Sequence, residues 1–493
     1  MDVEAFANHV ERPVGRGHLP EHACTGAAGG AACGDLIRVS VVVDAHSPDG
    51  VIVDAGFDAS GCGAAIAAGS ATVELVRGQS LLAAARVGTS QIAGELGGLS
   101  PSKHHAAELA ADALHGALGW AAREQAVLEP SKSRTVVAMS GGVDSAVAAL
   151  LIAESGQETV AVTLELWSDP ENDGERSCCS AQAVRSARQI AHEMGMAHFS
   201  IDLREEFRAG VVDGWLADHA AGLTPNPCVR CNGNVRLDAM LDLAERLGAP
   251  TLATGHYARV ETHEARESLL RMAVDEGKDQ SYALAALSPS SLARLRFPLG
   301  ALTKTEVRVL AERAGLEVAR RPDSQDLCFL AGTGRADFLA RHGGLQRRAG
   351  AIVDRDGHEL GEHGGVHTVT VGQRHGLGIG GGAPLYVIST DPQANTVTVG
   401  SREHLRTDSV RVRDVTLHRD GEDVDGVKVR YRGRRMPCRV EGFLRAGAHE
   451  RAEVRMLEQI ERTAPGQIAC LYAGDVIVGH GTIALGVDAS FGA

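Results

Sequence analysis

The chain has 493 residues, of which 44% are hydrophobic and 23% charged, and its formal net charge is −14. A chain of this length cannot fold around one hydrophobic core, so we expect several domains, and the negative charge argues against non-specific adhesion to nucleic acid. No apolar run approaches the ~18 to 20 residues of a membrane span, and the N-terminus has no signal-peptide layout. These features predict a cytoplasmic protein with no membrane partner.

Residues 1–128 show two kinds of periodicity. The stretches LIRVSVVVD (36–44) and VIVDAGFDAS (51–60) alternate apolar and polar side chains, as half-buried strands do. AAIAAGSATVELV (64–76) and HHAAELAADALHGAL (104–118) are typical of helices. The segment therefore predicts a small α+β domain that ends in helices.

Residues 129–335 begin with a polar stretch, EPSKSR, and then alternate strands with helices. Strands are expected at 135–139, TVAVTL (159–164), HFSIDL (198–203) and TLATG (251–255), with helical spacing between them. Such alternation predicts an α/β domain with a parallel sheet covered by helices.

From residue 336 the sequence changes to glycine-rich turns and period-2 strands. Examples are HTVTVGQ (367–373), NTVTVG (395–400), VRVRDVTL (410–417) and VKVRYR (427–432). This texture predicts a small central β-rich domain at 336–405 and a C-terminal β-barrel at 406–493. The expected fold is multidomain: one α+β domain, one parallel-sheet α/β domain and two β domains.

The stretch SGGVDS, Ser140 to Ser145, lies between an expected strand and an expected helix. Its glycines let the backbone approach an anion, which exposed amides and the helix N-terminus can hold. It lacks the Gly-Lys-Ser/Thr ending of a Walker loop, so transfer of a terminal phosphate is not indicated. The six residues resemble the PP-loop of ATP pyrophosphatases, which implies ATP and Mg²⁺ as cofactors and cleavage of ATP to AMP and pyrophosphate.

Five further motifs narrow this resemblance, and together they cover residues 134 to about 490. They resemble, in this order, those of the tRNA 2-thiouridylases: TPNPCVRCN (224–232), ATGHYARV (253–260), GKDQSYAL (277–284), RPDSQDLCFL (321–330) and HTVTVGQRHGLGIGG (367–381). The resemblance implies ATP-dependent 2-thiolation of the wobble uridine of tRNA. A uridine carbonyl is a poor electrophile, so adenylation must make its oxygen a leaving group before a nucleophilic sulfur attacks.

The same resemblance implies the residues of the site. Cys231 and Cys328 would be catalytic, one carrying sulfur and the other completing its release. ATP contacts are implied at Ala138, Met139, Ser140, Gly141, Gly142, Val143, Asp144, Ser145, Leu164 and Gly255. Contacts with tRNA are implied at His256, Lys278, Asp279, Gln280, Arg430, Tyr431 and Gln467. The implied partners are tRNA and a cysteine desulfurase or sulfur-relay donor.

Two of these assignments have plainer alternatives. His256 could be a hydrogen-bonded buried histidine. The arginines around Tyr431 could form a solvated strand edge, although on so acidic a chain they also suit a track for RNA phosphates.

Cys228 departs from the family pattern, in which many members have aspartate at this position as the presumed acid/base group. Here Cys228 and Cys231 form CxxC, a spacing suited to one metal, and Cys328 can supply a third thiolate. Three thiolates on a 4Fe-4S cluster would leave one iron open to hold sulfide. A persulfide route through Cys231 and Cys328 and a purely structural CxxC stay open as alternatives.

The first domain resembles the U-type iron-sulphur scaffold proteins, through HACTGAAGGAACGD (22–35), DASGCGAA (58–65) and SKHHAAEL (102–109). The resemblance places Cys33, Asp35 and Cys62 in ligand positions, with His105 where the scaffold has a third cysteine. These four residues could bind zinc or an iron-sulphur cluster. We expect the domain to deliver a cluster or sulfur to the attached thiolase, since fusion raises the local concentration of the donor. A degenerate domain kept only for docking is the alternative.

Two other function classes fit part of the sequence. The chain could be an iron-sulphur cluster assembly or carrier protein with an accessory nucleotide-binding module, or an amide-forming ATP pyrophosphatase. Cys231 and Cys328 discriminate, because amide synthesis needs neither, and assembly alone does not need GKDQSY.

Overall fold

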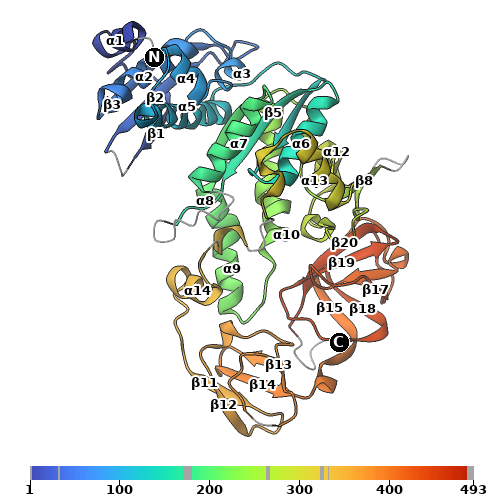
Figure 1. Cartoon of the computed structure of the whole chain (residues 1–493). Helices are drawn as coiled ribbons and strands as arrows, with labels where there is room; N and C mark the ends of the chain where they lie inside the picture. Colours follow the sequence, from blue (N-terminus) through green and yellow to red (C-terminus); the bar gives the residue numbers. More distant parts are fainter. Residues whose placement is uncertain are drawn as a thin grey trace. The chain divides into compact units, whose positions relative to one another are not determined.

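The computed structural model describes residues 3–30, 34–169, 180–262, 267–322, 327–330, 332–380 and 382–485 (Figure 1). The chain divides into two units, each built from separate stretches. The first comprises Met1–Arg204, Ala239–His256 and Arg294–Phe329, and the second comprises Glu205–Asp238, Tyr257–Ala293 and Leu330–Ala493. Among the helices of the described stretches, none has the length and apolar character needed to cross a bilayer.

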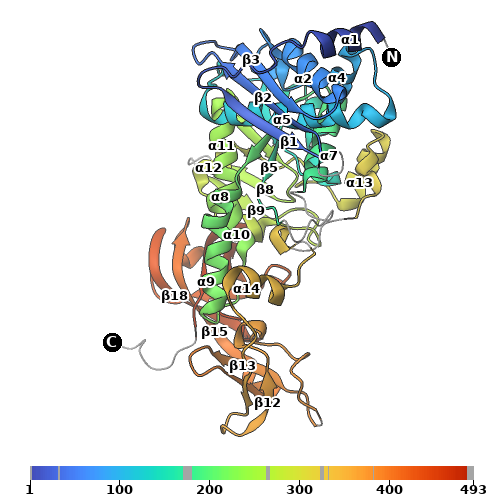
Figure 2. The same cartoon turned by 90° about the vertical axis from the view of Figure 1, so that its left-hand side faces the viewer.

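The N-terminal part of the first unit is a three-stranded antiparallel sheet packed against helices (Figure 2). Its strands are β1 (Cys24–Gly29), β2 (Leu36–Val43) and β3 (Ile52–Ser60). Its helices are α1 (Val3–Glu11), α2 (Gly63–Val76), α3 (Leu81–Ala84), α4 (Thr89–Glu95) and α5 (His104–Glu124). A side chain at Gly26 would meet the backbone of Ala113 at 2.1 Å, so α5 lies directly on β1. The expected α+β domain is confirmed.

The rest of the first unit is built on a five-stranded parallel sheet of order β10-β7-β4-β5-β6. Its strands are β4 (Arg134–Ala138), β5 (Glu158–Glu165), β6 (Ala197–Asp202), β7 (Thr251–Thr254) and β10 (Leu295–Arg296). Its helices include α6 (Val143–Glu154), α7 (Ala181–Glu193) and α13 (Lys304–Arg313), and α11 (Leu237–Arg246) enters it at residue 239. The predicted parallel α/β domain is confirmed.

The helices of the second unit are short and interrupted. They include α9 (Asp213–Ala220), α10 (Pro227–Cys231) and α14 (Arg335–Gly343), while α8 (Arg204–Phe207) and α12 (Pro289–Arg294) lie where the chain changes unit. Two π-helical turns, Arg208–Val212 and Asn232–Arg236, flank α9 and α10. Such turns are rare and often mark functional sites.

A small four-stranded sheet follows in the second unit, with order β12-β11-β14-β13. Its strands are β11 (Gly350–Val353), β12 (Glu359–His363), β13 (Tyr386–Asp391) and β14 (Thr396–Gly400). The strand predicted at HTVTVGQ is wrong: this stretch holds a 3-10 turn, Val366–Thr368, and then a turn through Gly372, which has φ +88°. Its alternating valines still pack on the sheet, because Val369 and Val371 contact the buried cluster around Ile352.

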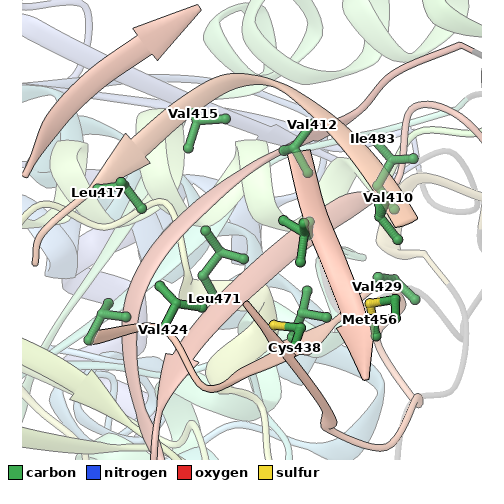
Figure 3. Close-up of a cluster of buried hydrophobic side chains, with 14 of the residues drawn as sticks. Val410, Val412, Val415, Leu417, Val424, Val429, Cys438, Met456, Leu471 and Ile483 are labelled. Atoms are coloured by element: carbon green, nitrogen blue, oxygen red, sulfur yellow. The ribbon is translucent and has the colours of Figure 1, made fainter. Parts of the chain in front are cut away.

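A closed six-stranded barrel ends the second unit, as predicted. It comprises β15 (Arg406–Leu417), β16 (Gly426–Lys428), β17 (Met436–Val440), β18 (Gly447–Glu461), β19 (Ile468–Ala473) and β20 (Val476–Ile483). The barrel closes because β15 pairs with both β18 and β20, which removes the free strand edges. Val412, Cys438, Met456 and Leu471 are among the side chains that fill it (Figure 3).

Two details of the barrel differ from the predicted strands. The strand expected at VKVRYR ends at Lys428, and the following residues turn, with Gly433 N bonded to Arg430 O. A hairpin from the motif region, β8 (Arg259–Thr262) and β9 (Ser268–Arg271), extends the barrel sheet beyond β20. The hairpin escaped prediction because its pairing partner lies about 200 residues away, and long-range pairing leaves no local signal.

Acidification is expected to weaken the first unit through two buried histidines. Burial lowers the pKa of His192 to about 4 and that of His198 well below its usual value, and the charge of Arg188 lowers both further. The unfolded chain therefore binds more protons below pH 6.5, so stability is full above that pH and falls as the pH drops towards 4, by on the order of 3 kcal/mol for His192 alone. Urea unfolding at pH 7.5 and 4.5 measures this loss. His192→Asn should reduce the difference without abolishing it, because His198 remains, and an unchanged difference would contradict the assignment.

Candidate functional site

The expected phosphate loop joins the end of β4 to the start of α6. Gly141 has φ +72°, and a side chain there would lie 2.9 Å from the carbonyl oxygen of Ala183, so only glycine fits. The Ser145 hydroxyl accepts a hydrogen bond from Ser140 N (3.1 Å) and donates one to Gly142 O (3.0 Å). These bonds hold the loop at the N-terminus of a twelve-residue helix, where an anion is favoured.

Two cations that were not predicted belong to this loop. The Lys304 ammonium donates to both carboxylate oxygens of Asp144, at 2.7 and 2.8 Å, and the Arg321 guanidinium donates to Gly141 O at 2.9 Å. Lys304 is the first residue of α13. It follows the N-cap residue Thr303, which forms a capping box with Glu306. The capping box was the available signal for a helix start at Lys304, while Arg321 opens the motif RPDSQDLCFL.

The remaining expected ATP residues surround the loop. A side chain at Gly255 would approach the backbone of Asp144 and Ser145 at 2.8 Å, so the end of β7 can close on α6 only with glycine. Ala138, Met139 and Val143 are buried beside the loop. Leu164 lies on β5 two residues beyond Val162, which pairs with Ala138. The structure thus gathers this set at the carboxyl end of the parallel strands, where α/β sheets bind ligands.

His256 follows directly after this edge. Its Nδ1 lies 2.8 Å from the Thr254 hydroxyl, and its ring packs edge-on against Phe297 at 6.3 Å between centroids. The imidazole is half-buried. The geometry is compatible with both the tRNA contact and the hydrogen-bonded buried histidine.

In the second unit, Cys228 and Cys231 lie one turn apart on α10, and therefore on the same side of the helix. The Asn226 side chain caps this helix by accepting from Cys228 N at 3.1 Å, and Pro227 occupies its first position. Cys231 is 8% exposed. Burial raises the pKa of the Cys228 thiol, with partial compensation from Arg236, so this sulfur is a protonated thiol at neutral pH in the absence of metal.

Gln280 of the GKDQSYAL motif is hydrogen-bonded to Tyr431, which lies near Cys228. Gln280 Oε1 accepts from Tyr257 N at 2.9 Å, and Gln280 also bonds the Tyr431 hydroxyl. Burial, and then the nearby Cys228 sulfur, raises the pKa of that phenol. The Tyr431 ring is still 38% exposed, so it can meet a ligand next to the CxxC helix.

Asp279 departs from the expectation of a direct tRNA contact. Its carboxylate is 1% exposed and forms an ion pair with Lys428 Nζ at 2.9 Å. It also accepts from Ala273 N at 3.0 Å and from the Ser281 hydroxyl at 2.9 Å. Since its oxygens are enclosed and bonded, Asp279 shapes the loop that carries Lys278 and Gln280.

The other expected tRNA residues differ in exposure. Arg430 is exposed next to Tyr431. Gln467 makes a structural contact: its amide donates to Thr224 O at 2.6 Å, and Thr224 N donates to Pro465 O at 2.8 Å, while its contact with tRNA stays a prediction. This pair of bonds fixes the segment that leads into α10.

Cys328 lies in the short helix Cys328–Leu330, where the first unit ends. It is partly buried, and its neighbour Phe329 packs edge-on against Trp167 at 6.4 Å. Because Cys328 belongs to the first unit and Cys228 and Cys231 to the second, the meeting of the three sulfurs stays a prediction.

The first domain brings three of its four expected ligands together. Asp35 Oδ2 lies 3.2 Å from Cys62 Sγ and 3.1 Å from His105 Nε2, and the three ligand atoms all lie within 4.8 Å of one another. Burial raises the pKa of Asp35, but hydrogen bonds from Cys62 and His105 outweigh it and hold the pKa below its usual value. A sulfur, a nitrogen and a carboxylate oxygen suit zinc or an iron-sulphur cluster. Cys33 lies outside the described residues.

Comparison with known proteins divides the chain into four matched regions. Family models match residues 3–126 (NifU-like N terminal domain), 133–332 (tRNA methyl transferase HUP domain), 336–401 (tRNA methyl transferase PRC-barrel domain) and 407–483 (Aminomethyltransferase beta-barrel domain). Among solved structures, a 4-thiouridine synthetase–RNA complex with bound ATP aligns with a TM-score of only 0.28, at 20% identity over 41% of this chain and 46% of that chain.

Curated relatives match over much longer stretches. A bifunctional protein NifU/MnmA of Rubrobacter xylanophilus is 43% identical over 97% of both chains. A tRNA-specific 2-thiouridylase MnmA of Geobacter metallireducens is 41% identical over 72% of this chain and 98% of its own length. The phosphate loop, the CxxC helix and the Asp-Cys-His cluster thus lie in one continuous match, and the chain belongs to the family of bifunctional NifU/MnmA proteins.

Proposed function

We propose that the chain is an ATP-dependent tRNA-uridine 2-sulfurtransferase that forms AMP and pyrophosphate. The observation that carries the proposal is the phosphate loop, with Lys304 and Arg321 bonded to it, in a chain whose CxxC helix lies beside Gln280 and Tyr431. An amide-forming ATP pyrophosphatase would use the loop alone. The name of the Geobacter relative, a tRNA-specific 2-thiouridylase, supports the thiolation reaction.

In the proposed first step the loop amides and the N-terminus of α6 hold the ATP phosphates. Lys304 and Arg321 supply positive charge, and Asp144 is the loop carboxylate that suits Mg²⁺. The O2 atom of the wobble uridine attacks the α-phosphorus, and pyrophosphate leaves. The uridine is then adenylated, so that AMP can leave from C2 in the next step.

In the proposed second step sulfur attacks C2 and AMP leaves. On the persulfide route, the terminal sulfur of a persulfide on one of Cys231 and Cys328 attacks, and the thiolate of the other cysteine then cleaves the S–S bond. This releases the 2-thiouridine sulfur and leaves a Cys231–Cys328 disulfide, which an external thiol must reduce.

On the cluster route, Cys228, Cys231 and Cys328 would hold a 4Fe-4S cluster, which would supply sulfide at its open iron. The two thiols of α10 fit this role because they lie one turn apart on one side of the helix. In the first domain, Asp35, Cys62 and His105, together with Cys33, would hold zinc or a cluster, and the domain would deliver a cluster or sulfur to the site.

Purified full-length protein tests the proposal directly. Anaerobic protein incubated with unmodified tRNA, ATP, Mg²⁺ and a sulfur source, either sulfide or cysteine plus a cysteine desulfurase, should yield 2-thiouridine by nucleoside mass spectrometry, together with AMP. Iron analysis and visible absorption separate the routes, since colourless, iron-free protein that still thiolates tRNA would exclude the cluster. Absence of 2-thiouridine with every sulfur source would refute the function.

Lys304→Met is expected to lower kcat/KM for ATP by about 10- to 100-fold, because an ammonium bonded to the carboxylate of the phosphate loop is lost. Pyrophosphate release measured against ATP concentration checks this. Arg313→Met, on the exposed last turn of the same helix, is the matched control and should change nothing. Equal kinetics in the two variants would remove Lys304 from the site.

A further inference from the structure

The NifU-like domain is joined to the parallel-sheet domain by an ordered interface within the first unit, not by a free tether. Residues that connect the two are hydrogen-bonded to both sides: Leu128 N to Arg246 O (2.7 Å), Glu129 N to Pro48 O (2.9 Å) and Ser131 N to Gly248 O (2.8 Å). Leu128 is also buried. The polar stretch EPSKSR therefore marks a domain boundary in sequence without providing freedom of movement.

Helix α5 covers the edge strand of the parallel sheet. A side chain at Gly119 would lie 1.9 Å from Ser200 O, so this turn of α5 touches the backbone of β6. The ring nitrogens of His115 lie 3.0 Å from His198 O and from Val87 O. From the same domain, Ala85 O accepts from His198 N at 3.0 Å. The free edge of β6 is thereby bonded to the NifU-like domain.

Charge complementarity strengthens this interface between α5 and α7. Asp112 of α5 accepts from Arg185 at 2.5 and 2.8 Å and from Arg188 at 2.6 Å. The Arg188 side chain is 6% exposed and that of Asp112 19%, so the pair is shielded from solvent and hard to replace by water.

The contacts extend over a long stretch of α5. Asp112 lies opposite Arg185 and Arg188, and three residues later His115 lies opposite His192, with 5.4 Å between ring centroids. Further along α5, Gly119 lies against Ser200 O, and the Arg123 guanidinium donates to Asp202 O at 2.6 Å, so the contacts extend along β6 as well.

The beginnings of α5 and α7 each carry a functional element. His105 of the metal-ligating cluster is in the first turn of α5, and Ala183, in the first turn of α7, touches the phosphate loop at Gly141. The interface thus joins the helix that carries one ligand of the metal-ligating cluster to the helix that backs the phosphate loop.

We propose that this docking positions the NifU-like domain to hand sulfur to the thiolation site of its own chain from a fixed place, with Asp112, Arg185 and Arg188 as positioning residues. The inference rests on the proposed function and adds its donor geometry. A carrier that swings on a tether would need a free linker and an uncommitted surface on α5, and this domain has neither.

Asp112→Arg in the full-length protein tests the docking, since it places a like charge against Arg185 and Arg188. Thiolation of tRNA is measured with two sulfur sources: cysteine plus a cysteine desulfurase, which loads the NifU-like domain, and free sulfide, which bypasses it. We expect at least a tenfold loss with the desulfurase and less than a twofold change with sulfide. Protease cleavage within residues 127–133 should become faster. Glu193→Arg, an exposed charge reversal on the same α7, is the control.

The outcomes distinguish a failure of the proposed docking role from a failure of the proposed thiolation function. Unchanged desulfurase-driven thiolation in a variant whose linker is cleaved faster would overturn the docking role, and so would equal loss with both sources in a folded protein. Should Asp112→Arg fail to fold, Asp112→Asn, which keeps the shape of the side chain, carries the same two-source comparison. Wild-type protein that makes no 2-thiouridine with either sulfur source would instead refute the proposed function.

Discussion

Cys231→Ala is expected to abolish 2-thiouridine formation while ATP binding persists, and Cys328→Ala should do the same. Both sulfurs are assigned to the transfer of sulfur, whereas the groups proposed to hold ATP lie in the loop Ser140–Ser145 with Lys304 and Arg321. Alanine removes one sulfur atom from a nearly buried position in α10, so the fold should tolerate it. Nucleoside mass spectrometry of tRNA and equilibrium binding of ATP measure the two effects.

The barrel provides matched controls for these variants. Cys438 and Cys470 are buried among barrel strands, where burial raises the pKa of Cys438 to about 12 and also raises that of Cys470. Such thiols are inert, and their alanine variants should thiolate normally. Normal 2-thiouridine in Cys231→Ala or Cys328→Ala would contradict the proposed reaction.

Cys228 separates the two chemical routes, because many relatives of the thiolase type are expected to carry aspartate there. On the persulfide route Cys228→Asp should stay active, since the carboxylate can serve as the acid/base group. On the cluster route it should lose iron and activity together, because a cluster ligand is gone. The measurement is iron content and thiolation of the same anaerobic sample.

Much of the fold could be predicted because local patterns and tertiary structure agree. The alternation in LIRVSVVVD became β2, and the strand–loop–helix reading of SGGVDS became β4, the phosphate loop and α6. HTVTVGQ failed for the opposite reason: its valines alternate towards the sheet, but Gly372 turns the chain before a ladder can form. A period-2 pattern indicates which side chains are buried, but it does not show whether the segment pairs with a neighbouring strand.

The residues of the candidate site could be predicted only where they belong to a sequence motif. Lys304 bonds Asp144, which is 160 positions away in the sequence, and no local pattern around Lys304 indicates that contact. Asp279 was assigned to tRNA from its motif, yet Lys428, 149 positions away, encloses its carboxylate. The polar stretch EPSKSR marked a domain boundary, but the sequence could not reveal that the amides of Leu128, Glu129 and Ser131 bond to Arg246, Pro48 and Gly248.

Lys428→Met is expected to destabilise the second unit by about 3–5 kcal/mol, because it leaves the Asp279 carboxylate charged and unpaired in a buried site. The lysine side chain is 7% exposed, so water cannot replace its ammonium. Asp279 also bonds Ala273 N and the Ser281 hydroxyl, and the loop with Gln280 depends on it. Unfolding in urea, followed by circular dichroism, measures the loss. Greater or unchanged stability would show that the pair is not needed.

The neighbouring ion pair between Arg434 and Glu458 is the matched comparison. It joins the same turn to β18 at 3.8 Å, but both side chains are more than two thirds exposed. Arg434→Met should therefore leave stability unchanged within error. If Lys428→Met also weakens tRNA binding well below its unfolding midpoint while Arg434→Met does not, the buried pair acts by holding Gln280 and Tyr431 in place, and not by adding positive charge for the RNA. Equal weakening in both variants would instead assign the effect to charge.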